Sequence, residues 1–168
     1  ITRLERIVND MTLYAFDKEL TRSKVNLKSL IGETLLMFSH EIAEKNIHVK
    51  KKTKGNLICY VDRDKIVTVI NNLFLNAMEA IGNDGCIELD IRRGKKNMFI
   101  QVKDDGGGIP EDIIPKIFIP FFTTKSRGTG LGLSIVHRIV QNHNGTIRAA
   151  NEGNGACFTV ILPREKIK

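Results

Sequence analysis

The 168-residue sequence has little of what would mark a membrane, secreted or zinc-binding protein. No run approaches the roughly 18 apolar residues that a membrane-spanning helix needs, and no signal peptide opens the chain. The three cysteines, Cys59, Cys86 and Cys157, are odd in number, far apart and without C-x-x-C spacing, which argues against a disulfide framework and against zinc. These absences favour a reducing, cytoplasmic setting, and they leave open whether the full protein is anchored in a membrane.

The residues that are present are typical of a globular protein, with 42% hydrophobic and 27% charged. The length suits one domain with a short appendage, which would bury roughly 70% of its unfolded surface. The formal net charge is +7, but Lys and Arg are scattered among acidic residues, and the clusters VKKKTK and RRGKK are typical of solvated turn flanks. We therefore expect no nucleic acid partner. Because the first residue is Ile1 rather than Met, we expect a piece of a longer protein.

Residues 1–20 form a separate helical segment in this prediction. Apolar side chains recur at alternating three- and four-residue steps, as in a heptad seam, at Ile1, Leu4, Val8, Met11 and Ala15. One interpretation is a helix packed on its own domain, and the other is the end of a longer coiled-coil or bundle helix. The second is favoured because the polar run DKELTRSK, typical of a linker, follows.

Helical and strand-like patterns alternate along the rest of the chain. Asp62 is the expected N-cap and Gly82 the expected C-cap of the longest helix. The expected elements are a helix at 27–46, strands at 47–52 and 57–61, a helix at 62–82, a hairpin at 86–104, a helix at 131–143 and a second hairpin at 146–163. Helices interleaved with paired strands predict an α/β two-layer sandwich, with a mixed, mostly antiparallel sheet packed on helices.

After residue 66, the helix predicted at 62–82 is apolar except for Asn71 and one polar stripe. At 100° per residue, its polar side chains fall within about 80° of one another, at Thr68, Asn72, Asn76, Glu79 and Asn83. A stripe that merely faces solvent usually carries Lys, Glu, Gln or Arg, whereas mid-helix Asn costs helix propensity. Asn amide oxygens four residues apart can hold a hydrated Mg²⁺ or a phosphate-bound water. The stripe therefore predicts a surface that faces a ligand.

A strand leads directly into Asp104, and three glycines at 106–108 follow. Glycines at a strand end let the backbone approach a flat ligand closely. A carboxylate fixed at that edge can accept a hydrogen bond from an exocyclic amine such as adenine N6. A plain turn or a metal site would give the same short pattern, so DDGGG alone does not decide.

A second glycine cluster, at Gly128, Gly130 and Gly132, leads into the helix at 131–143. Free amides at a helix N-terminus form an anion site. The spacing is neither that of a Walker G-K-[ST] loop nor that of a dinucleotide fingerprint. The pattern therefore predicts a phosphate site of another type.

The long segment between the two glycine clusters predicts a lid that orders on a ligand. We expect three aromatic side chains, Phe118, Phe121 and Phe122, to anchor it on the body. Lys125 and Arg127 lie in its polar part and can reach phosphates.

Taken in order, NLFLNAMEA, DDGGGIP, IFIPFFTTK and GTGLGLSIV resemble the N box, first glycine box, F box and second glycine box of bacterial sensor histidine kinases. These kinases belong to the gyrase, HSP90, histidine kinase and MutL superfamily. The resemblance covers residues 21–168 and implies a Bergerat-type ATP-binding fold. It implies a protein histidine kinase that binds Mg-ATP and donates the γ-phosphoryl group to a histidine, for relay to a response regulator receiver domain. Residues 1–20 would then be the end of the dimerisation and phosphotransfer helix. The full protein would be a homodimer, and this piece a monomer.

The resemblance also implies roles for individual residues. Asn72, Asn76 and Lys125 would be catalytic, with Asn76 as the Mg²⁺ ligand. Asp104 would read adenine N6, supported by Thr159. The residues implied to bind nucleotide are Asn72, Asn76, Asp104, Gly106, Gly108, Ile109, Phe122, Thr123, Thr124, Lys125, Gly128, Thr129, Gly130, Leu131, Gly132, Leu133 and Thr159.

Two positions depart from related families. The superfamily ATPases carry a Glu general base four residues before the metal-binding Asn, whereas this chain has Asn72 there, which favours kinase over ATPase. Many sensor kinases have a basic residue where Glu79 stands, and its role stays open. A serine kinase of the same fold, and an interaction module that has lost ATP, remain alternatives. His40 resembles the start of a phosphoacceptor motif, but the sequence after it does not continue that motif, so we expect a surface helix residue.

Overall fold

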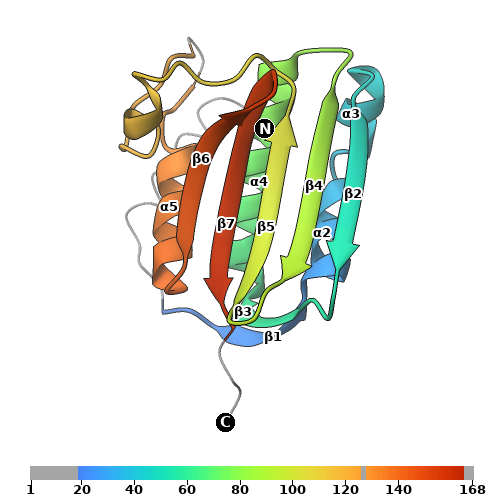
Figure 1. Ribbon diagram of the computed structural model, residues 1–168, viewed down its shortest axis with the longest axis vertical. Coiled ribbons are helices and arrows are strands. Elements are labelled where there is room, and N and C mark those ends of the chain that lie inside the picture. Colours follow the sequence, from blue (N-terminus) through green and yellow to red (C-terminus); the bar gives the residue numbers. More distant parts are fainter. Residues whose placement is uncertain (1–18, 126–127, 165–168) are drawn as a thin grey trace.

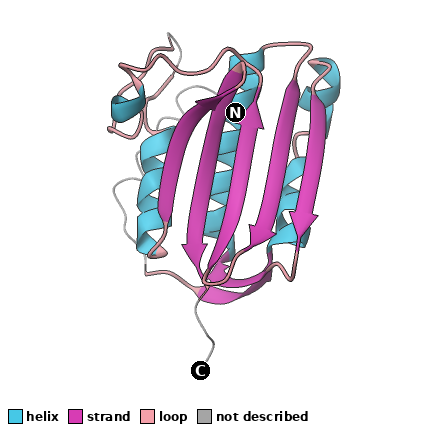
Figure 2. Ribbon diagram, in the orientation of Figure 1, coloured by secondary structure: helices cyan, strands magenta, loops and turns pink. Residues whose placement is uncertain are grey.

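A computed structural model describes residues 19–125 and 128–164, and these form two layers (Figure 1). One layer is a five-stranded sheet in the order β2-β4-β5-β7-β6, and helices cover one of its faces (Figure 2). The α/β two-layer sandwich expected from the sequence is therefore confirmed. Its strands are β2 (His48–Lys54), β4 (Cys86–Arg93), β5 (Asn97–Asp104), β6 (Thr146–Glu152) and β7 (Gly155–Pro163). The helices are α2 (Leu27–Leu36), α3 (Ser39–Glu44), α4 (Arg63–Ile81) and α5 (Gly132–Asn142).

The sheet is mixed and mostly antiparallel, as predicted. β4 with β5 and β6 with β7 form the two expected hairpins, β5 also pairs antiparallel with β7, and β2 runs parallel to β4. Alternate residues of β5, such as Ile100 and Val102, are buried against the helices, whereas Gln101 and Lys103 lie on the outer face. A separate two-stranded ribbon joins β1 (Arg22–Asn26) to β3 (Ile58–Asp62).

Helix α4 runs through the middle of the helical layer and contacts both α2 and α5. The Asp62 side chain caps its N-terminus by accepting from the Lys65 N–H, and the Gly82 N–H donates to the Met78 carbonyl at its C-terminus. Both caps agree with the sequence prediction. The buried face of α4 consists of Ile66, Val69, Ile70, Leu73, Phe74, Ala77 and Met78.

The single helix expected at 27–46 is wrong, because the chain breaks it into α2 and α3. The Thr34 hydroxyl donates to the Leu30 carbonyl one turn back, an interaction that bends helices. The break turns Phe38 inward, where its ring lies 5.6 Å from that of Phe74, and leaves Leu36 and Met37 exposed. The contact of the partly buried Phe38 with Phe74 is thus made at the break between the two helices.

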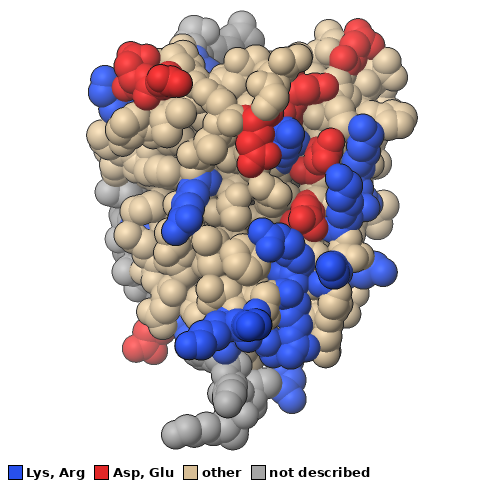
Figure 3. Space-filling model, viewed as in Figure 1, with Lys and Arg blue, Asp and Glu red and all other residues tan. Residues whose placement is uncertain are grey.

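Basic side chains gather over the lower part of the outer sheet face, where β2 and β4 end (Figure 3). The cluster VKKKTK lies within β2 rather than in a turn flank, and its residues from 50 to 54 are all exposed. Since β2 is an edge strand, these lysines discourage pairing with another chain. The second cluster, RRGKK, does flank a turn: its two arginines end β4, and residues 94–96 connect β4 to β5.

The helix predicted at the N-terminus falls outside the described residues, which begin at residue 19. Among the helices that are described, none combines the length and the apolar composition needed to cross a membrane.

Candidate functional site

Asp104 ends β5 as a buried carboxylate, only 4% exposed. Its Oδ1 accepts two backbone hydrogen bonds, from the Gly106 N–H at 2.9 Å and from the Ala156 N–H at 3.2 Å. No described residue donates to Oδ2, so that oxygen remains available to a ligand. Burial raises the pKa of this carboxyl above its ordinary value, and the two backbone donors partly oppose the shift.

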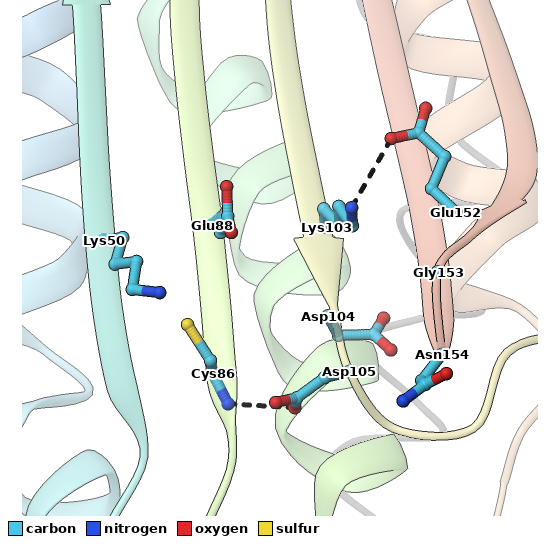
Figure 4. A pocket seen from close by; sticks show the side chains of 9 residues that line it. All are labelled: Lys50, Cys86, Glu88, Lys103, Asp104, Asp105, Glu152, Gly153 and Asn154. Atoms are coloured by element: carbon cyan, nitrogen blue, oxygen red, sulfur yellow. Dashed lines mark hydrogen bonds and ion pairs between the residues drawn. The ribbon is translucent and has the colours of Figure 1, made fainter.

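The neighbouring Asp105 has a different role. Its Oδ1 accepts from the Cys86 N–H at 2.9 Å and so fastens the start of β4 (Figure 4). A polar hollow of about 260 Å³ lies beside it, lined by Lys50, Cys86, Glu88, Lys103, Asp104, Asp105, Glu152, Gly153 and Asn154. Among the residues predicted to bind nucleotide, only Asp104 lines this hollow. The hollow is therefore not the predicted nucleotide site.

The first glycine cluster packs directly on α4. A Cβ added at Gly106 would lie 2.5 Å from the Ala80 carbonyl carbon, so any side chain there would push the loop off the helix. Gly107 and Gly108 have φ of 92° and 77°, which L side chains rarely adopt. Glycine is thus required at this point both for close approach and for backbone conformation.

The two stripe asparagines of α4 stand between the glycine clusters. The Asn72 Nδ2 donates to the Thr68 carbonyl at 2.9 Å, and a Cβ added at Gly132 would lie 2.6 Å from the Asn72 Oδ1. Asn76 lies one turn further along α4, partly buried, and its amide makes no hydrogen bond with any described residue. Asn72 therefore marks the end of the site next to α5, and Ala80 marks the end next to Asp104. These ends are about 12 Å apart along the helix axis.

Helix α5 begins without a capping side chain, at the second glycine cluster, where the sequence predicts a phosphate site. Its N-cap residue, Leu131, supplies no side-chain hydrogen bond, and its first turn has no acidic residue. Gly130 has a φ of 69°, and a Cβ there would lie 2.4 Å from the Phe121 carbonyl carbon. The free amides and the positive end of the helix dipole face the Asn72 side of the site.

The segment from residue 109 to residue 125 follows the first glycine cluster and contacts both α4 and α5. Its only described helical turn is η1 (Ile114–Lys116). Phe118 anchors it by stacking on His137 of α5 with ring centroids 5.4 Å apart, and Phe122 is partly buried. Phe121 was expected to anchor the segment as well, and this expectation is wrong. Its φ of 66° turns the side chain outward and leaves it 62% exposed.

Lys125 is held by an ion pair with Glu79 of α4, with Nζ and Oε2 2.5 Å apart. Its own N–H donates to the Thr123 hydroxyl at 3.1 Å. This pair gives Glu79, whose role the sequence left open, a partner in the segment that carries the predicted phosphate contact. Arg127 falls outside the described residues.

The remaining predicted residues line the same loops. Thr123 also crowds Gly128, where an added Cβ would lie 2.4 Å from the Thr123 hydroxyl oxygen. The Thr129 hydroxyl accepts from the Leu131 N–H at 3.3 Å. Ile109 and Leu133 are partly buried against the core, and Thr124 is exposed.

Thr159 does not support Asp104, and that prediction is wrong. Thr159 lies opposite Gln101 in the pairing of β7 with β5, on the outer face of the sheet. There the Thr159 side chain hydrogen-bonds the Cys157 thiol. Asp104 faces the helices, so the sheet separates the two side chains. The support comes instead from the Ala156 backbone N–H, which side-chain reasoning missed. The recurrence of large apolar residues at every second position, Phe158, Val160 and Leu162, is the sequence signal for this register.

His40 lies on α3 with a side chain 94% exposed, 3.8 Å from the Glu44 carboxylate. The prediction of a surface helix residue is confirmed. Among the described residues, no group of three or more His, Cys, Asp or Glu side chains is arranged to hold a metal ion. A divalent ion in this site would therefore rely on amide oxygens and on the ligand itself.

Residues 61–166 match a family model described as histidine kinase-, DNA gyrase B- and HSP90-like ATPase. The chain belongs to this family. It is 38% identical over 163 residues to the sensor histidine kinase ZraS of Escherichia coli (strain K12), an alignment that covers 96% of this chain and 35% of ZraS. The chain thus spans about a third of that relative.

Two comparisons with solved structures show which kind of domain within this family the chain resembles. The catalytic domain of histidine kinase ThkA has a TM-score of 0.81 and 37% identity, covering 85% of this chain and 95% of that domain. ThkA in complex with the response regulator protein TrrA has a TM-score of 0.86 and 35% identity, covering 97% of this chain and 48% of that one. The fold described above is therefore that of a histidine kinase catalytic domain, and the family uses ATP.

Proposed function

We propose that this domain binds Mg-ATP and donates the γ-phosphoryl group to a histidine of a phosphotransfer domain, for relay to a response regulator. The observation that carries the proposal is the placement of two unlike sites along α4. The free Oδ2 of Asp104 lies at one end, and the uncapped start of α5 beside Asn72 lies at the other. An adenine amine fits the first, and a polyphosphate fits the second.

Adenine selectivity follows from the charge and position of Asp104. Its carboxylate accepts hydrogen bonds, so it favours the exocyclic amine of adenine and repels the O6 oxygen of guanine. Its Oδ1 is already held by the Gly106 and Ala156 amides, which fixes the direction of Oδ2 before the ligand arrives. A pre-set acceptor loses little freedom on binding, which improves affinity.

Asn76 is the residue that fits Mg²⁺, because its amide has no partner among the described residues and Mg²⁺ keeps several waters alongside few protein oxygens. The ion, when bound, neutralises charge on the phosphates. Lys125 would then leave Glu79 for the γ-phosphate, and the amides at the start of α5 would hold the other phosphates.

Transfer to a protein acceptor is favoured over hydrolysis. The position of the ATPase general base is Asn72, whose amide cannot take a proton from water. The resemblance to sensor histidine kinases, rather than to serine kinases, supports histidine as the acceptor.

The proposal extends to the rest of the protein. Residues 1–20 would be the end of the dimerisation and phosphotransfer helix, residues 21–168 the catalytic domain, and the full protein a homodimer in which the acceptor histidine lies outside this chain. The complex of ThkA with TrrA supports a receiver domain as the downstream partner. The odd number and wide spacing of the three cysteines support a cytoplasmic position for the domain.

Titration calorimetry with ATP and with GTP, each with Mg²⁺, tests the proposal. We expect ATP to bind and GTP to bind at least about tenfold more weakly, because Asp104 would face an oxygen in place of an amine. Equal affinity for the two nucleotides would overturn the assigned role of Asp104. No binding of either would overturn the proposed function.

A further inference from the structure

Asn151, near the end of β6, holds the first glycine cluster by its side chain. Its Oδ1 accepts from the Ile109 N–H at 2.8 Å, and its Nδ2 donates to the Ile109 carbonyl at 2.7 Å. Both ends of one amide therefore bind both backbone groups of one residue. An amide held at two points has one orientation, so it fixes the backbone at Ile109 in place and in direction.

The same part of the β6–β7 hairpin holds the carboxylate of the site. Asn151 pairs across the hairpin with Ala156, whose N–H donates to the Asp104 Oδ1. The Gly107 N–H also donates to the Asn154 carbonyl in the turn of this hairpin, at 2.8 Å. One hairpin thus sets both the acceptor at Asp104 and the backbone of the glycine cluster.

The Asn151 side chain matters because the three glycines of the loop carry no side chains of their own. Gly106, Gly107 and Gly108 lose more conformational freedom on ordering than any other residue type would. A Cβ added at Gly108 would lie 2.9 Å from the Asn151 Oδ1, so the side chain of Asn151 also fills the space beside this glycine. Asn151 therefore supplies a side-chain attachment that the glycines of the loop cannot supply themselves.

We infer that Asn151 is a positioning residue for the adenine end of the site: it presets the glycine cluster through Ile109 without touching the nucleotide. The inference rests on the proposed function. The role requires the Asn151 amide itself, because Oδ1 must accept from the Ile109 N–H while Nδ2 donates to the Ile109 carbonyl. Aspartate would turn a second oxygen toward the Ile109 carbonyl and replace attraction with repulsion. Alanine would remove both hydrogen bonds and leave the loop free.

The test compares Asn151→Ala and Asn151→Asp with the unchanged protein by ADP calorimetry, carried out well below the thermal midpoint. Asn97 provides matched controls, Asn97→Ala and Asn97→Asp, because it lies in the same sheet at the opposite end of β5 from Asp104. We expect the Kd for ADP to rise about tenfold in Asn151→Ala and further in Asn151→Asp, with the controls unchanged. Hydrogen exchange at the Ile109 amide should accelerate in both Asn151 variants without nucleotide.

A kinetic split separates positioning from a general structural role. With a separate phosphotransfer hairpin as acceptor, the Asn151 variants should raise the KM for ATP and leave kcat unchanged, because the phosphate end is intact. Unchanged ADP affinity in both Asn151 variants would overturn the inference. So would a loss of affinity accompanied by an equal loss of kcat and a lowered Tm, which would mark a merely structural residue. Failure of the unchanged protein to bind ADP would instead overturn the proposed function.

Discussion

The Glu79 carboxylate and the Lys125 ammonium form an ion pair that joins α4 to the segment between the glycine clusters, with Oε2 and Nζ 2.5 Å apart. Both side chains are 43% exposed, so solvent screens the pair, and such pairs contribute at most about 1 kcal/mol. A weak link of this kind suits a residue that must exchange one anionic partner for another. It holds Lys125 against α4, and the proposed function requires that the pair then releases Lys125 to a phosphate.

Glu79→Gln should therefore release Lys125. We expect trypsin to cut after Lys125 faster than in the unchanged protein when no nucleotide is present, by up to about fivefold for a link of about 1 kcal/mol. A non-hydrolysable ATP analogue with Mg²⁺ should slow that cut in both proteins, because the γ-phosphate then holds the lysine.

The control for this prediction is Glu33→Gln, which removes another surface ion pair, with Arg63 at 2.7 Å. That pair lies away from the site, so its loss should leave cleavage at Lys125 unchanged. If Glu79→Gln and Glu33→Gln give the same cleavage rate as the unchanged protein, the Glu79 link has no role in holding the segment.

Asp104→Asn should lower the affinity for ATP and raise the stability of the protein without nucleotide. The weaker acceptor should lower ATP affinity by about tenfold or more, since a hydrogen bond to a charged group contributes roughly 1.5–3 kcal/mol. The protein without nucleotide should become more stable at neutral pH, because a buried charge is removed while an amide oxygen can still accept from Gly106 and Ala156. Calorimetry and urea unfolding measure the two effects.

The stability gain should depend on pH in a defined direction. Because the folded-state pKa of Asp104 is raised, its protonated form favours the folded state, and this contribution is lost as pH rises through the folded-state value. The advantage of Asp104→Asn should thus be largest near neutral pH and shrink as pH falls toward and below the ordinary aspartate pKa of 3.8, where the wild-type carboxyl becomes protonated in both states. A stability difference that grows as pH falls would contradict the burial argument.

Gly132→Ala tests the contact between α4 and α5. The new methyl group would lie 2.6 Å from the Asn72 Oδ1 and should push that side chain out of place. We expect ATP affinity to fall by about tenfold while the fold persists, because only a side chain has to move. Gly32→Ala in α2 is the matched control, since a Cβ there meets nothing within 4 Å. Equal ATP affinity in the two variants would show that Asn72 does not contribute to binding.

Much of the fold follows from local signals in the sequence. The caps Asp62 and Gly82 bound α4, and alternation of apolar residues predicts both hairpins, because these features depend on neighbours along the chain. The break between α2 and α3 depends on Phe38 reaching Phe74, a contact between distant residues that helical periodicity does not contain. Long-range packing is thus where the sequence prediction fails.

The site divides in the same way. Asp104, the glycine clusters and the asparagine stripe were recognisable because residue type and spacing carry their chemistry. The Ala156 N–H could not be recognised in the sequence because it is a backbone group. The Asn151 amide could not be recognised because it contacts a residue 42 positions away. The position of Thr159 on the outer face of the sheet depends on the pairing of β7 with β5, which the sequence does not state.

The most direct test of the account supplies this domain with an acceptor. The domain is incubated with γ-labelled ATP and Mg²⁺, alone and with a separate phosphotransfer hairpin that carries its histidine. We expect no label on the domain alone, and weak, acid-labile label on the hairpin, because the tether that raises the effective concentration is missing. Acid-labile label on His40 of the domain, or no label on the hairpin under conditions in which ATP is bound, would contradict the account.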